Sequence, residues 1–519
     1  MPTLEWIGKD KVINHHLDVP YRVLERKYSY DEGGQHEEDN GSENMIIHGD
    51  NLDALKPLLP RYEGRIDCIY IDPPYNTGNE KWIYNDNVND PRIQKWLGEV
   101  VGAEGEDLCR HDKWLCMMYP RLQLLRRLLS DSGIILISID EHELSNLILI
   151  MDDLFGERNH VETIIWEKKS GAKGVPPRSM MVNVHEYIVA YQKDEGFRFV
   201  GEKRDAIADG FKNPDNDPRG PWRMSNIKST TKSLDEAFTI TDPDTGKEYT
   251  NTWAFSKESL DRMIQEKRIL WKESLPKQKE FLYEMTNENK AIKSSWGVFD
   301  AQSTTVFLKQ IIPSLKFDNP KPISLLNRII EVATKQDAVI LDSFAGSGTT
   351  AHAVLNMNKA NGGHRRFILV EMMDYADSIT AERVKRVIQG YGTGKQAVAG
   401  TGGSFSYYEL GEPLMIGDNL NEDVDIDKIR EYVFFTETKC RLPEAREDEP
   451  YYLGEHANNA YYFYYEQSQI TTLNRDFLRT VKTKADGYVI YADLCTLSDE
   501  ELERHHITFK KIPRDITKL

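Results

Sequence analysis

An acid, two prolines and a tyrosine directly follow an apolar run in the stretch CIYIDPPYNTG (68–78). Consecutive prolines fix the backbone and remove two hydrogen-bond donors, so neither a strand nor a helix continues through them. Asp72 and the Pro73 carbonyl remain as acceptors, and Tyr75 offers a flat stacking surface. This cluster suits the amino group of a planar base, which makes Asp72, Pro73, Pro74 and Tyr75 candidate catalytic residues. A rigid turn capped by an aspartate is the simpler alternative.

A glycine-rich turn follows a second apolar run, in DAVILDSFAGSGTT (337–350). Its glycines let a ligand approach the backbone, and the start of the next helix presents free N–H groups to an anion. A phosphate loop would carry a lysine here, so a single carboxylate, such as that of S-adenosylmethionine, suits the turn better than a triphosphate. Glu371, after the next apolar run, is placed to accept hydrogen bonds from ribose hydroxyls. The candidate cofactor-binding residues are Asp342, Phe344, Ala345, Gly346, Gly348, Thr349 and Glu371, together with Asp72 of the first loop; a turn that only closes the chain is the alternative.

The two loops need elements that bring them together. Near-continuous apolar runs rich in β-branched residues alternate with helix-like patterns, which is typical of a mostly parallel sheet covered on both faces. We therefore predict a doubly wound α/β domain, in which ligands bind beyond the carboxyl ends of the strands and both loops share one crevice. The strand-like runs, each of which ends in a polar or small cluster, are 45–51, 67–75, 133–143, 185–193, 337–348 and 366–374, and the helix patterns are 114–133, 142–156 and 322–335.

The alternation stops between residues 196 and 318, where turn formers, charges and tryptophans gather, and it resumes afterwards. We interpret this segment as an insertion in the α/β domain. Residues 398–412 are interpreted as a linker to a small C-terminal α+β domain. The predicted domains are therefore 1–195, 196–318, 319–397 and 398–519.

Composition restricts the class of protein. With 519 residues the chain is too long for one compact core. Five scattered cysteines argue against a disulfide framework or a zinc cluster, and no apolar run approaches the roughly 20 residues of a membrane span. We therefore expect a cytoplasmic protein with no membrane partner. The net charge of -18 argues against nucleic-acid binding, except in clefts and in the insertion, where charge is nearly balanced.

The motifs together resemble a known family. IDPPYNTG followed later by DSFAGSGTT resembles the DNA amino-methyltransferases, and this order, with an insertion between the motifs, resembles their beta class. Over residues 45–395 the chain also resembles the modification subunits of type III restriction systems. The stretches that carry this second resemblance are HGDNLDALKPLL (48–59), GIILISIDEHE (133–143), HEYIVAYQK (185–193), NPDNDPRGPWR (213–223) and NPKPISLLNRII (319–330).

The resemblance implies a Rossmann-like, S-adenosylmethionine-dependent methyltransferase that acts on adenine N6 in double-stranded DNA, since cytosine-N4 enzymes more often have serine in place of Asp72. It implies that the insertion is a target-recognition domain, and that Asp50 and Lys321 lie near the cofactor. No metal ion is expected, because nitrogen attack on a sulfonium needs no Lewis acid. The implied DNA contacts are Asn76, Arg219, Arg223, Lys228 and Lys232.

Several alternatives stay open. The target could be cytosine N4, and the enzyme could act alone, since the chain is short for a modification subunit, or pair with a restriction helicase and nuclease subunit. A nucleotide-hydrolysing enzyme lacks its phosphate-loop lysine, and the intact motifs argue against an inert DNA-binding module. His185, beside Glu186, is interpreted as a structural histidine, and the aromatic residues of 461–467 as core or dimer packing. The acidic C-terminal region suggests a protein interface, and hence a homodimer.

Overall fold

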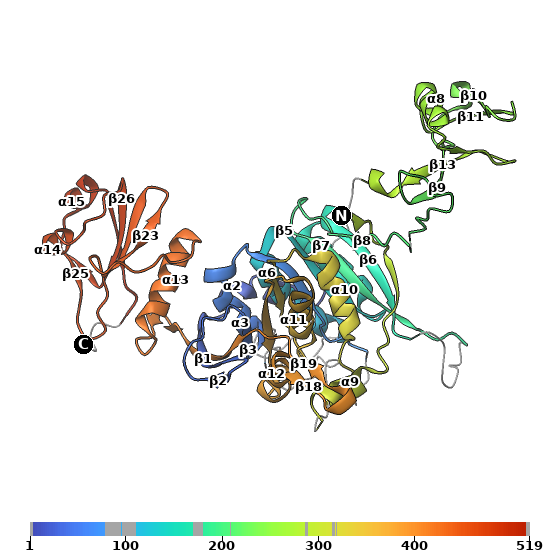
Figure 1. Cartoon of the computed structure of the whole chain (residues 1–519). Helices are drawn as coiled ribbons and strands as arrows, with labels where there is room; N and C mark the ends of the chain where they lie inside the picture. The colour runs from blue at the N-terminus through green and yellow to red at the C-terminus, as the bar shows by residue number, and fades with distance from the viewer. Residues whose placement is uncertain are drawn as a thin grey trace. The chain divides into compact units, whose positions relative to one another are not determined.

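The computed structural model describes residues 4–77, 95, 110–169, 180–207, 209–285, 289–313, 317 and 319–514. The chain divides into two compact units (Figure 1), of which the first combines Met1–Phe199 with Lys293–Leu519 and the second is Val200–Ile292. The second unit falls inside the segment interpreted as an insertion, whereas residues from Lys293 onward belong to the first.

An 11-stranded sheet is the centre of the first unit. Its strands, in spatial order, are β15 (Ser295–Val298), β6 (His160–Glu167), β7 (His185–Gln192), β5 (Leu129–Ile139), β4 (Ile66–Ile71), β16 (Val339–Asp342), β17 (Arg366–Glu371), β3 (Met45–His48), β20 (Phe405–Pro413), β1 (Arg22–Asp31) and β2 (Gly34–His36). The run from β5 to β20 is parallel, whereas β7 is antiparallel to both β5 and β6. The predicted doubly wound, mostly parallel sheet is confirmed.

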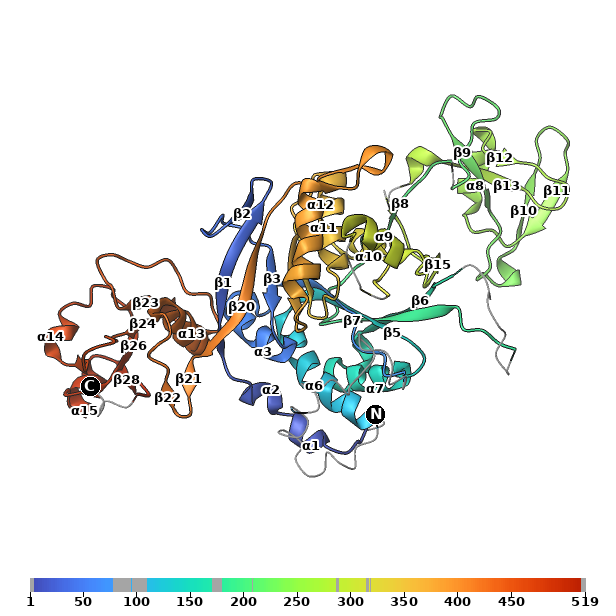
Figure 2. The same cartoon turned by 90° about the horizontal axis from the view of Figure 1, so that it is seen from below.

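Successive residues of the parallel strands point to opposite faces, and each face packs against its own layer of helices. On β4, Ile69 and Ile71 join the core formed with helices α3 (Asn51–Leu55), α6 (Arg110–Leu128) and α7 (Leu144–Phe155). Cys68 and Tyr70 join the core formed with α10 (Ile323–Ala333), α11 (Thr349–Asn361) and α12 (Glu382–Gln389). Figure 2 shows these two helix layers on opposite sides of the sheet.

Two segments differ from the expectation. Helix α6 ends at Leu128, and Leu129, expected inside that helix, begins β5 opposite Ile66 of β4. Pairing with β4 therefore overrides a helical pattern that ends in the weak helix formers of SDSG. Residues 398–412, interpreted as a linker, contain most of β20, which is parallel to β3 and antiparallel to β1. The chain thus completes the central sheet before it reaches its C-terminal part.

The C-terminal part of the first unit contains a four-stranded sheet and three helices. Tyr461 and Phe463 of its second strand lie in one hydrophobic cluster and Tyr462 lies in another, so these aromatic residues pack in a core. No helix in the described ranges is both long and apolar enough to span a bilayer. The strands of this sheet and the helices beside it are α13 (Ile426–Thr438), β23 (Tyr452–His456), β24 (Asn459–Phe463), α14 (Arg475–Leu478), β26 (Gly487–Ala492), α15 (Asp499–Arg504) and β28 (Ile507–Lys511).

The second unit is built from small antiparallel sheets around its own hydrophobic core, which includes the fully buried Trp253, Ile227 and Leu260. Its strands are β8 (Glu202–Lys203), β9 (Trp222–Asn226), β10 (Phe238–Thr241), β11 (Glu248–Asn251), β12 (Ile269–Leu270), β13 (Lys277–Phe281) and β14 (Asn289–Lys290), and its helix is α8 (Lys257–Gln265). A separate core of this kind is what a unit needs in order to fold as a module.

Candidate active site

The two loops predicted to carry chemistry follow neighbouring strands. β4 and β16 are parallel and pair at Cys68 with Ile340 and at Ile69 with Leu341, so their carboxyl ends lie at the same edge of the sheet. One cavity is lined by both loops and by the segment before α10. Its lining residues are Tyr70, Asp72, Phe317, Asn319, Pro320, Lys321, Leu326, Asp342, Phe344, Ala345, Gly346, Ser347, Thr349 and Thr350.

The two prolines of the first loop differ in what their carbonyls contact. Trp114 of α6 donates a hydrogen bond from Nε1 to the Pro74 carbonyl at 2.7 Å. Within the described part of the chain, no group donates to the Pro73 carbonyl, although Pro73 is buried. The Pro73 carbonyl therefore keeps its capacity to accept a hydrogen bond from a ligand.

Asp72 lies in a connected polar network. The Lys321 ammonium is 3.0 Å from Asp72 Oδ1 and 3.4 Å from Glu186 Oε2, and it donates to the Tyr75 hydroxyl at 2.7 Å. The Tyr75 hydroxyl in turn donates to Glu186 Oε2 at 3.0 Å, and Lys168 Nζ is 3.3 Å from Glu186 Oε1. Lys321 thus joins the loop Asp72–Tyr75 to the segment that precedes α10.

The protonation of these groups follows from their burial and their neighbours. Burial raises the pKa of Asp72, and the nearby Lys321 offsets part of this rise. Burial opposes the charged form of Lys321, yet Asp72 and Glu186 together raise its pKa above the ordinary value. Burial also opposes ionisation of Glu186, but Lys321 and Lys168 outweigh it, and the pKa of Glu186 is lowered. Lys321 and Glu186 are therefore held charged, whereas burial opposes the ionisation of Asp72.

The glycine loop is tight and internally bonded. Gly346 and Gly348 have φ angles of 52° and 75°, and a Cβ on Gly348 would lie 3.0 Å from the Thr380 carbonyl oxygen. The fully buried guanidinium of Arg383 donates to Ser347 Oγ at 2.9 Å and to Thr349 Oγ1 at 2.7 Å. These bonds hold the loop against the start of α12.

Two buried acids flank the same loop. Asp342 accepts hydrogen bonds from the Phe344 amide at 3.0 Å and the Thr350 hydroxyl at 2.5 Å, and burial raises its pKa to about 7. Glu371 accepts from the backbone amides of Gly346 at 2.8 Å and Met373 at 2.9 Å, and burial likewise raises its pKa to about 7. Both carboxyls therefore change charge near neutral pH.

Asp50 lies beside Glu371 but is not among the residues that line the cavity. It caps α3 by accepting from the Leu52 amide at 2.8 Å, and it pairs with Arg121 of α6 at 3.1 Å. The neighbouring Gly49 amide donates to the Glu371 carbonyl oxygen at 3.0 Å, which places the Asp50 turn next to the end of β17.

The residues predicted to contact DNA have different environments. Asn76 is only 5% exposed, and its side chain donates to the Arg110 carbonyl and to the buried carboxylate of Glu143. This environment argues that Asn76 holds the loop that follows β4, because a DNA contact needs an exposed side chain. A separate group of three residues just after β5 could hold a metal ion. It consists of Asp140, Glu141 and His142, and it is the one such group in the described ranges.

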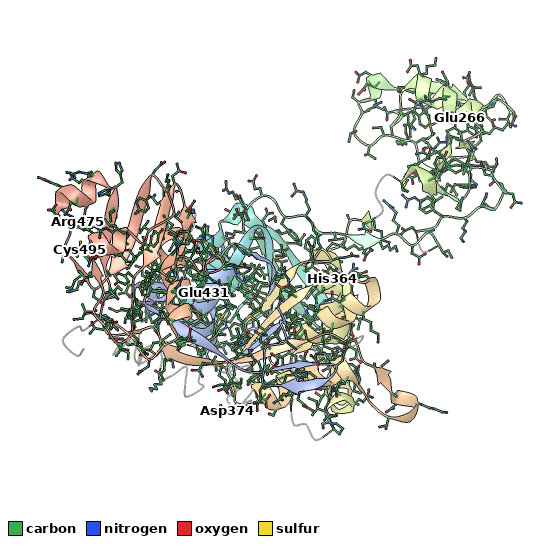
Figure 3. All side chains as sticks on the ribbon, turned by 60° about the vertical axis from the view of Figure 1, so that its left-hand side comes forward. Glu266, His364, Asp374, Glu431, Arg475 and Cys495 are labelled. Atoms are coloured by element: carbon green, nitrogen blue, oxygen red, sulfur yellow. The ribbon has the colours of Figure 1, made fainter. Side chains whose placement is uncertain are left out.

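The four basic residues predicted to contact DNA lie in the second unit. Arg219 pairs with Asp217 at 2.8 Å and donates to the carbonyl of Glu266, a residue labelled in Figure 3. Arg223 pairs with Glu280 at 2.6 Å. Lys228 and Lys232 are exposed. The lysines are therefore the more accessible of the four to a polyanion.

Sequence reasoning missed three side chains of the site. Glu143 and Glu186 lie in two of the stretches that carry the family resemblance, but the sequence assigns no chemistry to either, and Arg383 lies in no motif. A charged residue within an apolar run was the available signal for Glu186, because a buried charge requires a partner.

Known proteins with similar sequences support a single family. The family model described as DNA methylase matches residues 66–382, more than half of the chain. The StyLTI Mod subunit of a type III restriction-modification enzyme from Salmonella typhimurium strain LT2 is 33% identical over 384 residues, which are 67% of this chain and 58% of that protein. The EcoPI Mod subunit of Escherichia phage P1 is 30% identical over 71% of this chain and 63% of its own length.

The chain thus spans about three-fifths of the length of these two Mod subunits. The type II methyltransferase M.KpnI of Klebsiella pneumoniae is 30% identical over 64% of this chain and 81% of its own length. Among solved structures, the cytosine-N4-specific PvuII DNA methyltransferase has 12% identity and a TM-score of 0.35, over 66% of this chain and 86% of its own. From the match to the family model and to M.KpnI, the chain belongs to the DNA methylase family.

Proposed function

We propose that this chain is a site-specific DNA methyltransferase that transfers a methyl group from S-adenosylmethionine to the N6 amino group of a flipped adenine in double-stranded DNA. One observation carries the proposal: the loop Asp72–Tyr75 and the loop 342–350 follow adjacent parallel strands, and Asp72 of the first loop lines one cavity together with the second loop. An acceptor for an amino group and a backbone cradle for a carboxylate ligand therefore face the same space.

The glycine loop fits S-adenosylmethionine in three respects. Gly348, with no Cβ, precedes the first turn of α11, where backbone amides suit a carboxylate. Glu371 lies at the end of the neighbouring strand β17, where its carboxylate suits a ribose diol. The Ser343 hydroxyl is buried without a hydrogen-bond partner in the described ranges, as expected where a polar ligand completes the site.

The cofactor supplies an electrophilic methyl group on a cationic sulfur. The chain's own residues act on the amino group: Asp72 and the Pro73 carbonyl accept its two N–H hydrogen bonds, and Tyr75 stacks on the base. As the nitrogen becomes positive, the bond to the Asp72 carboxylate strengthens, which lowers the barrier to transfer. The base must leave the helical stack first, at a cost of a few kcal/mol that contacts in the pocket offset.

The test is methylation of duplex DNA by the purified chain, with isotope-labelled S-adenosylmethionine and mass spectrometry of the nucleosides. We expect labelled N6-methyladenine at one sequence context, with and without EDTA. Labelled N4-methylcytosine would contradict the assignment of the base. Absence of label in DNA, at a protein concentration where the cofactor binds, would contradict the function itself.

We also propose that the chain works in a restriction-modification system. The names of the two Mod subunits, which are 33% and 30% identical to this chain, support this proposal. Co-expression with a type III restriction subunit, followed by size-exclusion chromatography, tests the pairing. Light scattering of the chain alone tests whether it forms a homodimer.

A further inference from the structure

Glu186 lies at the active-site edge because of the direction of its strand. β7 is antiparallel to β5, with Tyr187 opposite Ile139, the last residue of β5. The start of β7 therefore reaches the edge at which the parallel strands end. Glu186 is only 8% exposed, and burial of a charged group at this edge requires partners with opposite charge.

The partners of Glu186 are the residues that surround Asp72. One carboxylate oxygen, Oε2, accepts from the Tyr75 hydroxyl at 3.0 Å and lies 3.4 Å from the Lys321 ammonium. The other, Oε1, is 3.3 Å from Lys168. Lys321 also contacts Asp72 at 3.0 Å. Glu186 therefore contacts Tyr75, which stacks on the base in the proposed function, and Lys321, which contacts Asp72. Glu186 thus acts on Asp72 through its neighbours.

The charges of the network balance. Asp72 and Glu186 carry two negative charges, and Lys321 and Lys168 carry two positive charges. Without Glu186, the half-buried Lys168 ammonium would lose the carboxylate it contacts, and Lys321 would have Asp72 as its only acidic partner among the contacts described above. An ammonium held tightly on Asp72 competes with the amino group that Asp72 must accept.

We infer that Glu186 is a positioning residue for methyl transfer, which fixes the Tyr75 hydroxyl and shares the Lys321 ammonium so that Asp72 stays available to the amino group of the base. This inference rests on the proposed function. It assigns a role to a residue that contacts neither the reacting nitrogen nor the glycine loop.

The pH dependence of transfer separates this role from simple structural support. The titratable groups that face Asp72 are Lys321, Glu186, Tyr75 and Tyr70, with Asp342 farther along the cavity. Lys321 lowers the pKa of Asp72, and the charge of Glu186 raises it. Removing the charge of Glu186 should therefore shift the acid limb of the rate profile to lower pH, and removing Lys321 should shift it to higher pH.

The experiment measures single-turnover methyl transfer to duplex DNA against pH for wild type, E186Q and K321M. We expect E186Q to lower the rate about 10- to 100-fold, as expected for losing a hydrogen bond to a charged group, and to move the acid limb downward. K321M should move the acid limb to higher pH. Glu162→Gln, on an exposed part of β6, is the matched control and should leave rate and profile unchanged.

Either of two results would overturn the inference: transfer by E186Q at the wild-type rate, or a slower rate with an unmoved acid limb. If E186Q fails to bind S-adenosylmethionine, E186D is measured in its place. E186D keeps the negative charge, so it should slow transfer without moving the acid limb of the rate profile. A moved acid limb in E186D would then overturn the inference. If wild type transfers no methyl group, the proposed function fails. If wild type transfers and the E186Q profile does not shift, only this inference fails.

Discussion

At the scale of single residues, Asp72 should act on the chemical step alone. Asp72→Ala removes one preorganised acceptor of the developing positive charge, and single-turnover transfer should fall by roughly 10²–10³. Affinity for S-adenosylmethionine, measured by calorimetry, should stay nearly unchanged, because Asp342, Glu371 and the glycine loop remain intact. A wild-type transfer rate, or a loss of affinity as large as that of a Gly346 variant, would contradict this division of labour between the two loops.

Glu371 should make cofactor binding depend on pH near neutrality. Its pKa is raised to about 7 by burial, so the carboxyl is protonated below that pH and ionised above it. Only the ionised form offers a full set of acceptors to a ribose diol, so affinity for S-adenosylmethionine should rise about tenfold from pH 6 to pH 8.

Calorimetric titrations of wild type and Glu371→Gln at pH 6, 7 and 8 test this expectation. The variant should bind S-adenosylmethionine more weakly, and its affinity should lose most of the pH dependence. The pH dependence that remains is assigned to Asp342, whose pKa is also about 7. If affinity changed with pH by the same amount in both proteins, Glu371 would have no role in cofactor binding.

The residues that could be predicted from the sequence are those whose spacing along the chain carries the chemistry. Asp72 and Tyr75 lie in one short loop, and Gly346 and Gly348 lie in another, so each cluster is visible before folding. Glu186 and Arg383 act on those loops from elsewhere in the chain, and only the order of the strands brings them there. The charge of Glu186 within an apolar run indicates that it has a partner, but which groups Glu186 and Arg383 contact follows only from the fold.

At the scale of elements, the first turn of α11 depends on a glycine at its start. Gly348 and Gly362, at the two ends of this helix, both have positive φ, at 75° and 67°. An alanine at either position pays a left-handed penalty of about 1 kcal/mol in the free energy of unfolding. Only at Gly348 would the new Cβ meet backbone, the Thr380 carbonyl oxygen at 3.0 Å; at Gly362 nothing lies within 4 Å.

We therefore expect Gly348→Ala to weaken binding of S-adenosylmethionine and Gly362→Ala to leave it unchanged, while urea unfolding shows a loss of stability in both. Gly362→Ala is the matched control, because it carries the same backbone cost at the far end of the helix. Equal cofactor affinity in the two variants would mean that the close approach at Gly348 serves packing alone.

Elements were predictable where one pattern dominates. The apolar run of β4 stops at a proline pair, and the expected strand is present. β5 and β20 were less clear because pairing with a neighbouring strand decides their ends: Leu129 pairs with Ile66, and Phe405 pairs with Tyr30. Such long-range pairing leaves no local signal, so a helix was extended too far and a strand was interpreted as a linker.

At the scale of the molecule, we expect methyl transfer to belong to the first unit and recognition of the DNA sequence to belong to the second. All residues that line the active-site cavity belong to the first unit, whereas Val200–Ile292 has its own core around Trp253. Lys228 and Lys232 are exposed in this second unit, where they suit phosphate contacts. We therefore propose that the second unit selects the DNA sequence, and that the first unit methylates the adenine within that sequence.

A chimera in which residues 200–292 are replaced by the equivalent unit of a relative with a known, different site tests this separation. The chimera should methylate the relative's site, read by sequencing of modified DNA, with S-adenosylmethionine affinity unchanged. The charge-neutral double variant K228Q/K232Q is the companion: affinity for all DNA sequences should fall, and the slope of log affinity against log salt should decrease by about 2, one for each lost phosphate contact. A chimera that keeps the original site would place sequence recognition in the first unit, because the second unit would then contribute only non-specific affinity.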